Sequence, residues 1–149
     1  MNMRHTMIIA LSFLWAGLSL GGNLIAAPAK FQVASLPVST LLQIGQAQFN
    51  WLGTSQWIFV VLIVLLVAMS GRTLFLILSI PVMIFIVQEW LLMPALDTRT
   101  VSVIAGQTIS ANPMLHFGFV GAEIIKCLSL ILGSLILIQK MVVRSQKPC

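Results

Sequence analysis

The sequence predicts an all-α polytopic membrane protein, a bundle of four transmembrane helices. Of its 149 residues, 59% are hydrophobic and only 7% are charged, and the mean hydropathy is +1.07. A typical soluble domain carries about 25% charged residues, because its surface must be covered with polar groups. So few charges exclude a water-soluble globular domain and leave a chain that is mostly surrounded by lipid.

Four apolar stretches stand out along the chain, at about residues 7–27, 56–71, 73–93 and 114–141. A helix needs about 20 apolar residues to cross about 30 Å of hydrocarbon. The second and third stretches are separated only by Ser70, Gly71 and Arg72, which predicts a tight helical hairpin. We therefore expect a single membrane domain over residues 1–149.

Residues 38–55, between the first and second spans, form an amphipathic segment. Its apolar residues recur at helical spacing (Val38, Leu41, Leu42, Gly45, Phe49, Leu52), and its polar residues lie opposite (Ser39, Gln43, Gln46, Asn50). One interpretation is an interfacial helix or an extension of the second span on the outer side of the membrane. The other is that the Gln and Asn side chains line a polar vestibule.

The polar segment from Pro94 to Pro113 connects the third and fourth spans. Alternation over residues 100–104, followed by Gly106, predicts a short hairpin. Asn112 and Pro113 are typical of the N-cap and first residue of the last helix.

Positive charges predict the orientation, because Lys and Arg are enriched on the cytoplasmic side of membrane proteins. With the N-terminus inside, the cytoplasmic surfaces carry five basic residues (Arg4, Arg72, Lys140, Arg144, Lys147) and the outer connections carry two (Lys30, Arg99). This favours a multi-pass protein of the bacterial inner membrane with both termini cytoplasmic. An alternative is that the first apolar run, ending in APA, is a cleaved signal peptide, which would leave three spans.

The last span contains the polar residues of greatest interest, His116, Glu123 and Lys126. Positions 116 and 123 share a helical face, and Glu123 and Lys126 can pair at i, i+3. Buried charges in a membrane are costly unless they are paired, so they usually face the helix bundle. The predicted polar network also includes Glu89 and Asn23, which lie in the outer half of the bilayer, and a contact of Glu89 with His116 would form a titratable pair able to sense external pH.

Small residues predict close contact between the first and last spans. The first span carries Gly17 and Gly21 in a GxxxG pattern, and the last carries a stripe of Gly118, Ala122 and Gly133. Such residues let membrane helices approach closely. Lys30, at the outer end of the first span, is a candidate contact for a lipid phosphate.

The sequence contains no motif typical of an enzyme, so we expect no enzymatic activity, no catalytic residues and no cofactor. The two cysteines form no CxxC or zinc spacing, and no metal site is predicted. Basic residues are scattered singly, which excludes a nucleic-acid interface.

The chain resembles a family of small, uncharacterised bacterial inner-membrane proteins with four spans. The resemblance rests on LWAGLSLGG, APAKF, LLMPALDTR, IAGQTI and the last helix with its His, Glu and Lys. Members of that group often carry a basic residue at the position of Gln46 and an acidic residue at that of Gln56, whereas this sequence has neutral amides. The resemblance implies a four-helix membrane fold and no particular activity.

Three functional interpretations follow. The first is a non-enzymatic accessory or interaction component whose polar network of His116, Glu123 and Lys126 fixes helix packing. The second is a small proton-coupled or ion or ligand transporter that uses Glu123 and Lys126 as a relay. The third is a haem- or metal-binding membrane subunit. The lipid bilayer is the expected surrounding in each case, and a homo-oligomer or a larger membrane complex is compatible with so small a bundle.

Overall fold

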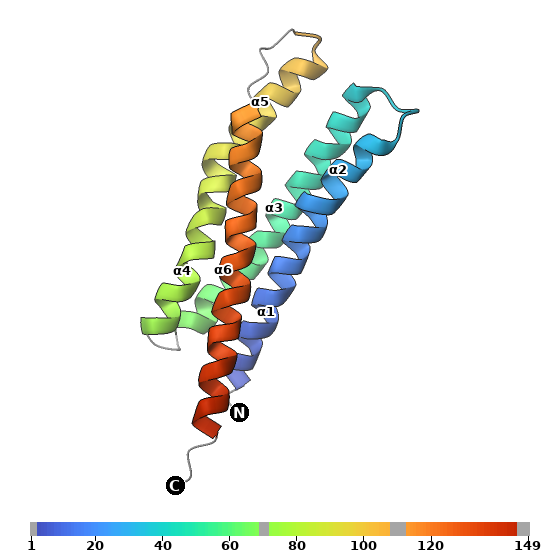
Figure 1. Cartoon of the computed structure of the whole chain (residues 1–149). Coiled ribbons are helices and arrows are strands. Elements are labelled where there is room, and N and C mark those ends of the chain that lie inside the picture. The colour runs from blue at the N-terminus through green and yellow to red at the C-terminus, as the bar shows by residue number, and fades with distance from the viewer. Residues whose placement is uncertain (1–2, 69–71, 108–112, 146–149) are drawn as a thin grey trace.

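The computed structural model describes residues 3–68, 72–107 and 113–145 of the chain. Within these ranges the protein is an all-α bundle of four long helical rods, as predicted (Figure 1). Four helices are long and apolar enough to cross a membrane: Met3–Gln32, Val38–Ala68, Leu74–Ile104 and Met114–Val143.

Two of the four rods are built from several helical segments, and the other two are single α-helices. The segments are α1 (Met3–Ser19), the π-helix η1 (Leu20–Ala26), α2 (Ala27–Ala29), the 3₁₀-helix η2 (Lys30–Gln32), α3 (Val38–Ala68), α4 (Arg72–Val87), the π-helix η3 (Gln88–Leu92), α5 (Met93–Ile104) and α6 (Pro113–Ser145).

The rods are longer than the apolar stretches that predicted them. A span of 31 residues such as α3 is about 46 Å long at 1.5 Å per residue, whereas the hydrocarbon core of a bilayer is about 30 Å thick. The amphipathic residues 38–55 are the first part of α3, so they extend the second span. Their apolar face packs inward, since Leu41, Gly45 and Leu52 are buried.

The hairpin predicted after Pro94 is wrong, because residues 93–104 form α5. This helix continues α4 through η3 and begins with Pro94 in its first turn, where proline is tolerated. Three hydroxyls of this segment donate to carbonyl oxygens four residues earlier, as is common in helices (Thr98 to Pro94, Thr100 to Leu96, Ser102 to Thr98). Of the predicted cap, Pro113 begins α6, and Asn112 lies outside the described residues.

The four rods run up and down, so that both ends of the described chain lie at the same end of the bundle (Figure 1). The end of α3 and the start of α4 lie at this end too, whereas the start of α3 and the end of α5 lie at the opposite end. Helix α1 packs against α6 and α3, and α4 packs against α6. The predicted contact between the first and last spans is therefore confirmed.

The apolar core fills the half of the bundle nearer the termini. It contains Ile8, Trp15, Ala16, Val60, Ile63, Val67, Leu74, Leu78, Phe85, Leu130 and Leu137. Phe85 makes edge contacts with two tryptophans, at centroid distances of 5.8 Å to Trp15 and 5.1 Å to Trp57. Such geometry suits the ring quadrupoles and fixes α1, α3 and α4 to one another.

The glycines of the predicted contact stripe do not act alike. A Cβ added at Gly17, Gly21 or Gly118 would meet no described atom within 4 Å, so these positions provide no close approach inside the chain. At Gly133 the added Cβ would lie 3.0 Å from the Ile77 side chain of α4. Ala122 is half-buried. The expected packing role therefore fits Gly133, which contacts α4 and not α1.

Substitutions at Gly133 and Gly17 compare a packed glycine with an open one. We expect Gly133→Leu to lower the free energy of unfolding by about 2 kcal/mol, because the added side chain overpacks the α4–α6 contact. Gly17→Leu should change stability by less than about 1 kcal/mol, since the site is open and leucine favours a helix. Thermal unfolding of the purified protein in detergent, followed by circular dichroism, measures both. Equal losses at the two positions would contradict the assigned packing.

Candidate functional site

A cluster of buried polar side chains lies at the middle of the bundle and joins all four spans. We call it the polar cluster: Trp15 and Ser19 from α1, Gln56 from α3, Gln88 from η3, and Glu123 and Lys126 from α6. At its centre the Lys126 ammonium lies 2.9 Å from Glu123 Oε2, the predicted i, i+3 ion pair. Lys126 also donates to Gln56 Oε1 at 2.6 Å.

Gln56 Oε1 is the shared acceptor that connects three spans. It accepts from Trp15 Nε1 at 2.9 Å, from Ser19 Oγ at 3.1 Å and from the Lys126 ammonium. An amide oxygen has two lone pairs and a partial negative charge, so it can serve several donors at once. A neutral amide therefore stabilises the buried cation without adding a second charge.

Gln88 completes the cluster from the third span. Its Nε2 donates to Glu123 Oε2 at 2.8 Å and to the Phe119 carbonyl at 3.4 Å. The Lys126 ammonium also lies 5.4 Å from the centre of the Phe85 ring, which adds a cation–π contact. Two acceptor atoms, Glu123 Oε1 and Gln88 Oε1, have no hydrogen-bond partner among the described residues.

The charged pair is sealed from solvent. Glu123 is 0% exposed and Lys126 is 1% exposed. Removing two charges from water costs several kcal/mol per ion, and only good mutual geometry with further hydrogen bonds offsets that cost. Gln56 of α3 and Gln88 of η3 supply those bonds, and Trp15 and Ser19 of α1 in turn bond to Gln56.

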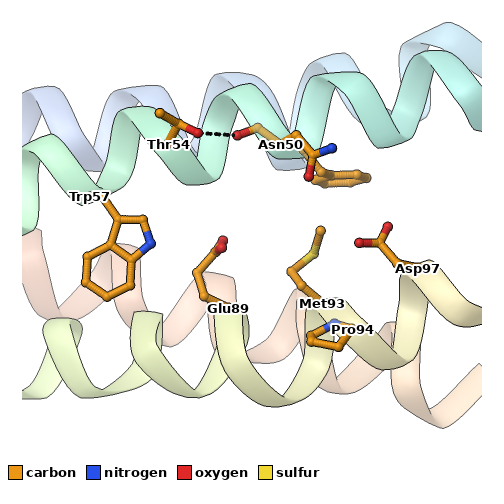
Figure 2. Close-up of a pocket in the computed structure, with 8 residues that line it drawn as sticks. Asn50, Thr54, Trp57, Glu89, Met93, Pro94 and Asp97 are labelled. Atoms are coloured by element: carbon orange, nitrogen blue, oxygen red, sulfur yellow. Dashed lines mark hydrogen bonds between the residues drawn. The ribbon is translucent and has the colours of Figure 1, made fainter.

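A separate pocket lies beside the polar cluster, between α3 and the η3–α5 segment (Figure 2). Its volume is about 390 Å³, which is within the usual size range of small-molecule sites. The residues that line it are Phe49, Asn50, Thr54, Trp57, Glu89, Met93, Pro94 and Asp97. The pocket thus combines two aromatic rings with two carboxylates.

Both carboxylates reach toward α3 from the opposite wall, with Met93 between them (Figure 2). Half-buried Glu89 lies against the backbone of α3, where a Cβ added at Gly53 would be 2.8 Å from Glu89 Oε1. Asp97 accepts a long hydrogen bond of 3.5 Å from Gln46 Nε2. Among the described residues neither carboxylate forms an ion pair.

Neighbouring residues of η3 serve the two sites. Gln88 is buried in the polar cluster, and Glu89 lines the pocket. Successive residues of a helix point about 100° apart, so one turn can serve both the bundle interior and the gap beside α3. The charges of Lys126 and Glu123 also act on Glu89 through space.

Two of the predicted network residues lie elsewhere. His116 is exposed, and the structure gives it no hydrogen bond or ion pair to a described residue; the predicted contact with Glu89 is therefore wrong. It lies in the first turn of α6, where Met114 and Phe117 are also exposed. Asn23 is buried in η1, but its Oδ1 has no partner in the described chain.

Lys30, the predicted lipid-phosphate contact, packs against aromatic rings of the chain. Its ammonium lies 5.4 Å from the ring centre of Phe31 and 5.2 Å from that of Phe49. Gly45 leaves the room for it, because an added Cβ there would collide with the lysine side chain. Contact with lipid stays a prediction.

Several residues of the polar cluster and of the pocket were not predicted from the sequence. The predicted network did not include Trp15, Ser19, Gln56 or Gln88, and Asp97 was predicted to lie in a loop. Glutamines in the middle of apolar spans are themselves a signal, since a buried amide needs partners. No group of three or more His, Cys, Asp or Glu side chains able to hold a metal ion occurs in the part of the chain that the structure describes.

Comparison with known proteins gives no relative from which a role could be transferred: no family model, no curated protein and no solved structure matches the chain.

Proposed function

We propose that this chain is a non-enzymatic accessory protein of the bacterial inner membrane, with both termini cytoplasmic, that binds a small molecule in the pocket between α3 and η3–α5. The observation that carries the proposal is the pocket of about 390 Å³ with Glu89 in its wall, a carboxylate that makes no ion pair among the described residues. The polar cluster supplies the rigid frame. A half-buried charge without a counter-ion is costly, and such residues in membrane proteins commonly mark ligand or ion sites.

Thiol labelling tests whether the pocket is open to water. We expect Thr54→Cys, in a chain with Cys127→Ser and Cys149→Ser, to react with N-ethylmaleimide about tenfold faster than Ile58→Cys, because the reactive thiolate forms only where water reaches it. Ile58 is a matched control, since it is 59% exposed one turn further along α3 and does not line the pocket. The rates are measured in membrane vesicles by mass spectrometry. Equal rates would contradict an open binding pocket.

A second candidate is a proton-coupled transporter in which Glu89 and Glu123 exchange a proton. The observation in its favour is Glu123 Oε1, a buried acceptor with no hydrogen-bond partner among the described residues. The binding function requires no such step. Proton uptake by liposomes under a pH gradient distinguishes the two, since only a transporter would lose that flux in Glu123→Gln.

A further inference from the structure

The chemistry of the pocket wall specifies what kind of molecule the pocket takes. Glu89 and Asp97 contribute two formal negative charges, and the cation that acts on Glu89, Lys126, is already paired with Glu123. Lys30 lies nearby, with its ammonium 5.2 Å from the Phe49 ring, but among the described residues it forms no ion pair with either carboxylate. The pocket therefore favours a positively charged occupant, which would offset the cost of holding two carboxylates in a membrane-spanning region.

The same wall distinguishes an organic cation from a metal ion. Glu89 and Asp97 are eight positions apart, about two helical turns, and Met93 lies between them (Figure 2). A single calcium or magnesium ion needs several oxygen ligands within about 2.6 Å. Carboxylates this far apart, separated by a thioether, suit a larger cation with an apolar body.

The aromatic side chains of the pocket wall also favour a cation. Trp57 and Phe49 line the pocket, and indole and phenyl faces attract cations. The chain already uses this chemistry at the same place, since the Phe49 ring holds the Lys30 ammonium at 5.2 Å. The position of Lys30 shows that an ammonium group fits beside Phe49, one of the rings that line the pocket.

We infer that the pocket between α3 and η3–α5 binds an organic cation of the amine or quaternary ammonium class, with its charge near Glu89 and its apolar body against Trp57 and Met93. This inference rests on the proposed binding function and specifies its ligand class.

Calorimetric titration of the full chain in a neutral detergent tests it, with benzyltrimethylammonium as the probe. Benzyl alcohol and benzenesulfonate keep the aromatic ring but are neutral and anionic. We expect the cation to bind and the other two not to bind. Glu89→Gln should raise the Kd for the cation about tenfold, because the nearest opposite charge is removed, and Asp97→Asn should raise it in the same direction.

A pair of tryptophans on α3 provides the matched control. Trp57→Leu should raise the Kd about fivefold, the value expected for one lost cation–π contact. Trp51→Leu should leave the Kd unchanged, because Trp51 is 75% exposed and does not line the pocket. Thermal unfolding of each variant shows that it is folded. If either Glu89→Gln or Asp97→Asn does not fold, the Kd of the other variant is compared with that of the unmodified protein.

The negative results are distinguishable. If benzyl alcohol or benzenesulfonate binds as tightly as the cation and both carboxylate variants bind normally, the cation class is overturned while a binding pocket remains. If none of the three probes binds but Thr54→Cys is labelled rapidly, the cation class is also overturned. If none binds and Thr54→Cys reacts no faster than Ile58→Cys, the proposed binding function itself is contradicted.

Discussion

Lys126→Met is expected to destabilise the protein by about 3–5 kcal/mol, the cost of leaving one partner of a buried ion pair alone. Methionine is close to lysine in length and removes the charge, but it leaves the Glu123 carboxylate, which is 0% exposed, without its counter-ion. It also removes the donor to Gln56 Oε1. Thermal unfolding in dodecyl maltoside, followed by circular dichroism, measures the loss.

Two further variants make that result specific. Lys140→Met changes an exposed lysine of the same helix and should alter the unfolding midpoint little. The double variant Lys126→Met with Glu123→Leu removes both charges and should recover much of the lost stability, because a buried pair can often be replaced by apolar residues of similar volume. A Lys126→Met protein as stable as Lys140→Met would mean that the buried pair does not hold the helices together.

Gln56→Met is expected to destabilise the protein by about 2–4 kcal/mol, because one change leaves three buried donors without their acceptor. These are Trp15 Nε1, Ser19 Oγ and the Lys126 ammonium, which all bond to Gln56 Oε1. The substitution keeps the side-chain length, so packing changes little. The loss should be measured by the same thermal unfolding experiment.

Gln43→Met is the control for that variant. Gln43 belongs to α3 as well, but it is exposed, so its replacement should shift the midpoint by less than about 0.5 kcal/mol in free energy. Gln56→Asp, in contrast, would place a third charge beside the pair. If Gln56→Met were as stable as Gln43→Met, the amide would not be the connection between α1, α3 and α6.

The fold class was predictable because it depends on composition and segment length. Four apolar stretches and 7% charged residues leave few alternatives to a four-span bundle. The pair of Glu123 and Lys126 was predictable as well, since i, i+3 neighbours on one helix meet through local geometry alone.

What the sequence could not reveal depends on contacts between helices. Gln56 and Lys126 are 70 positions apart, and no local pattern states that their spans face each other at that depth. His116 shares a helical face with Glu123, but its side chain is exposed, whereas that of Glu123 is buried. Helical periodicity predicts the direction of a side chain, whereas its burial depends on which neighbouring side chains pack against it.

The pocket could not be predicted because the secondary structure of residues 94–104 was predicted wrongly. Treating residues 94–113 as a loop with a hairpin left Asp97 without a fixed position, and only a continuous helix through η3 and α5 brings it to the same wall as Glu89. Alternation over residues 100–104, followed by Gly106, suggested a strand and a turn. The same residues are compatible with a helix, in which the hydroxyls of Thr98, Thr100 and Ser102 bond to carbonyl oxygens one turn earlier.

The two π-helical turns have an evolutionary consequence. Both follow the polar cluster directly, η1 after Ser19 and η3 from Gln88 onward, and a π turn holds more residues than an α turn without ending the helix. Gain or loss of one residue in η3 would therefore rotate everything beyond it by about 100°. Such a change would aim a different side chain than Asp97 at the pocket and leave the polar cluster intact, so the half of the bundle that contains the pocket could vary while the cluster is retained.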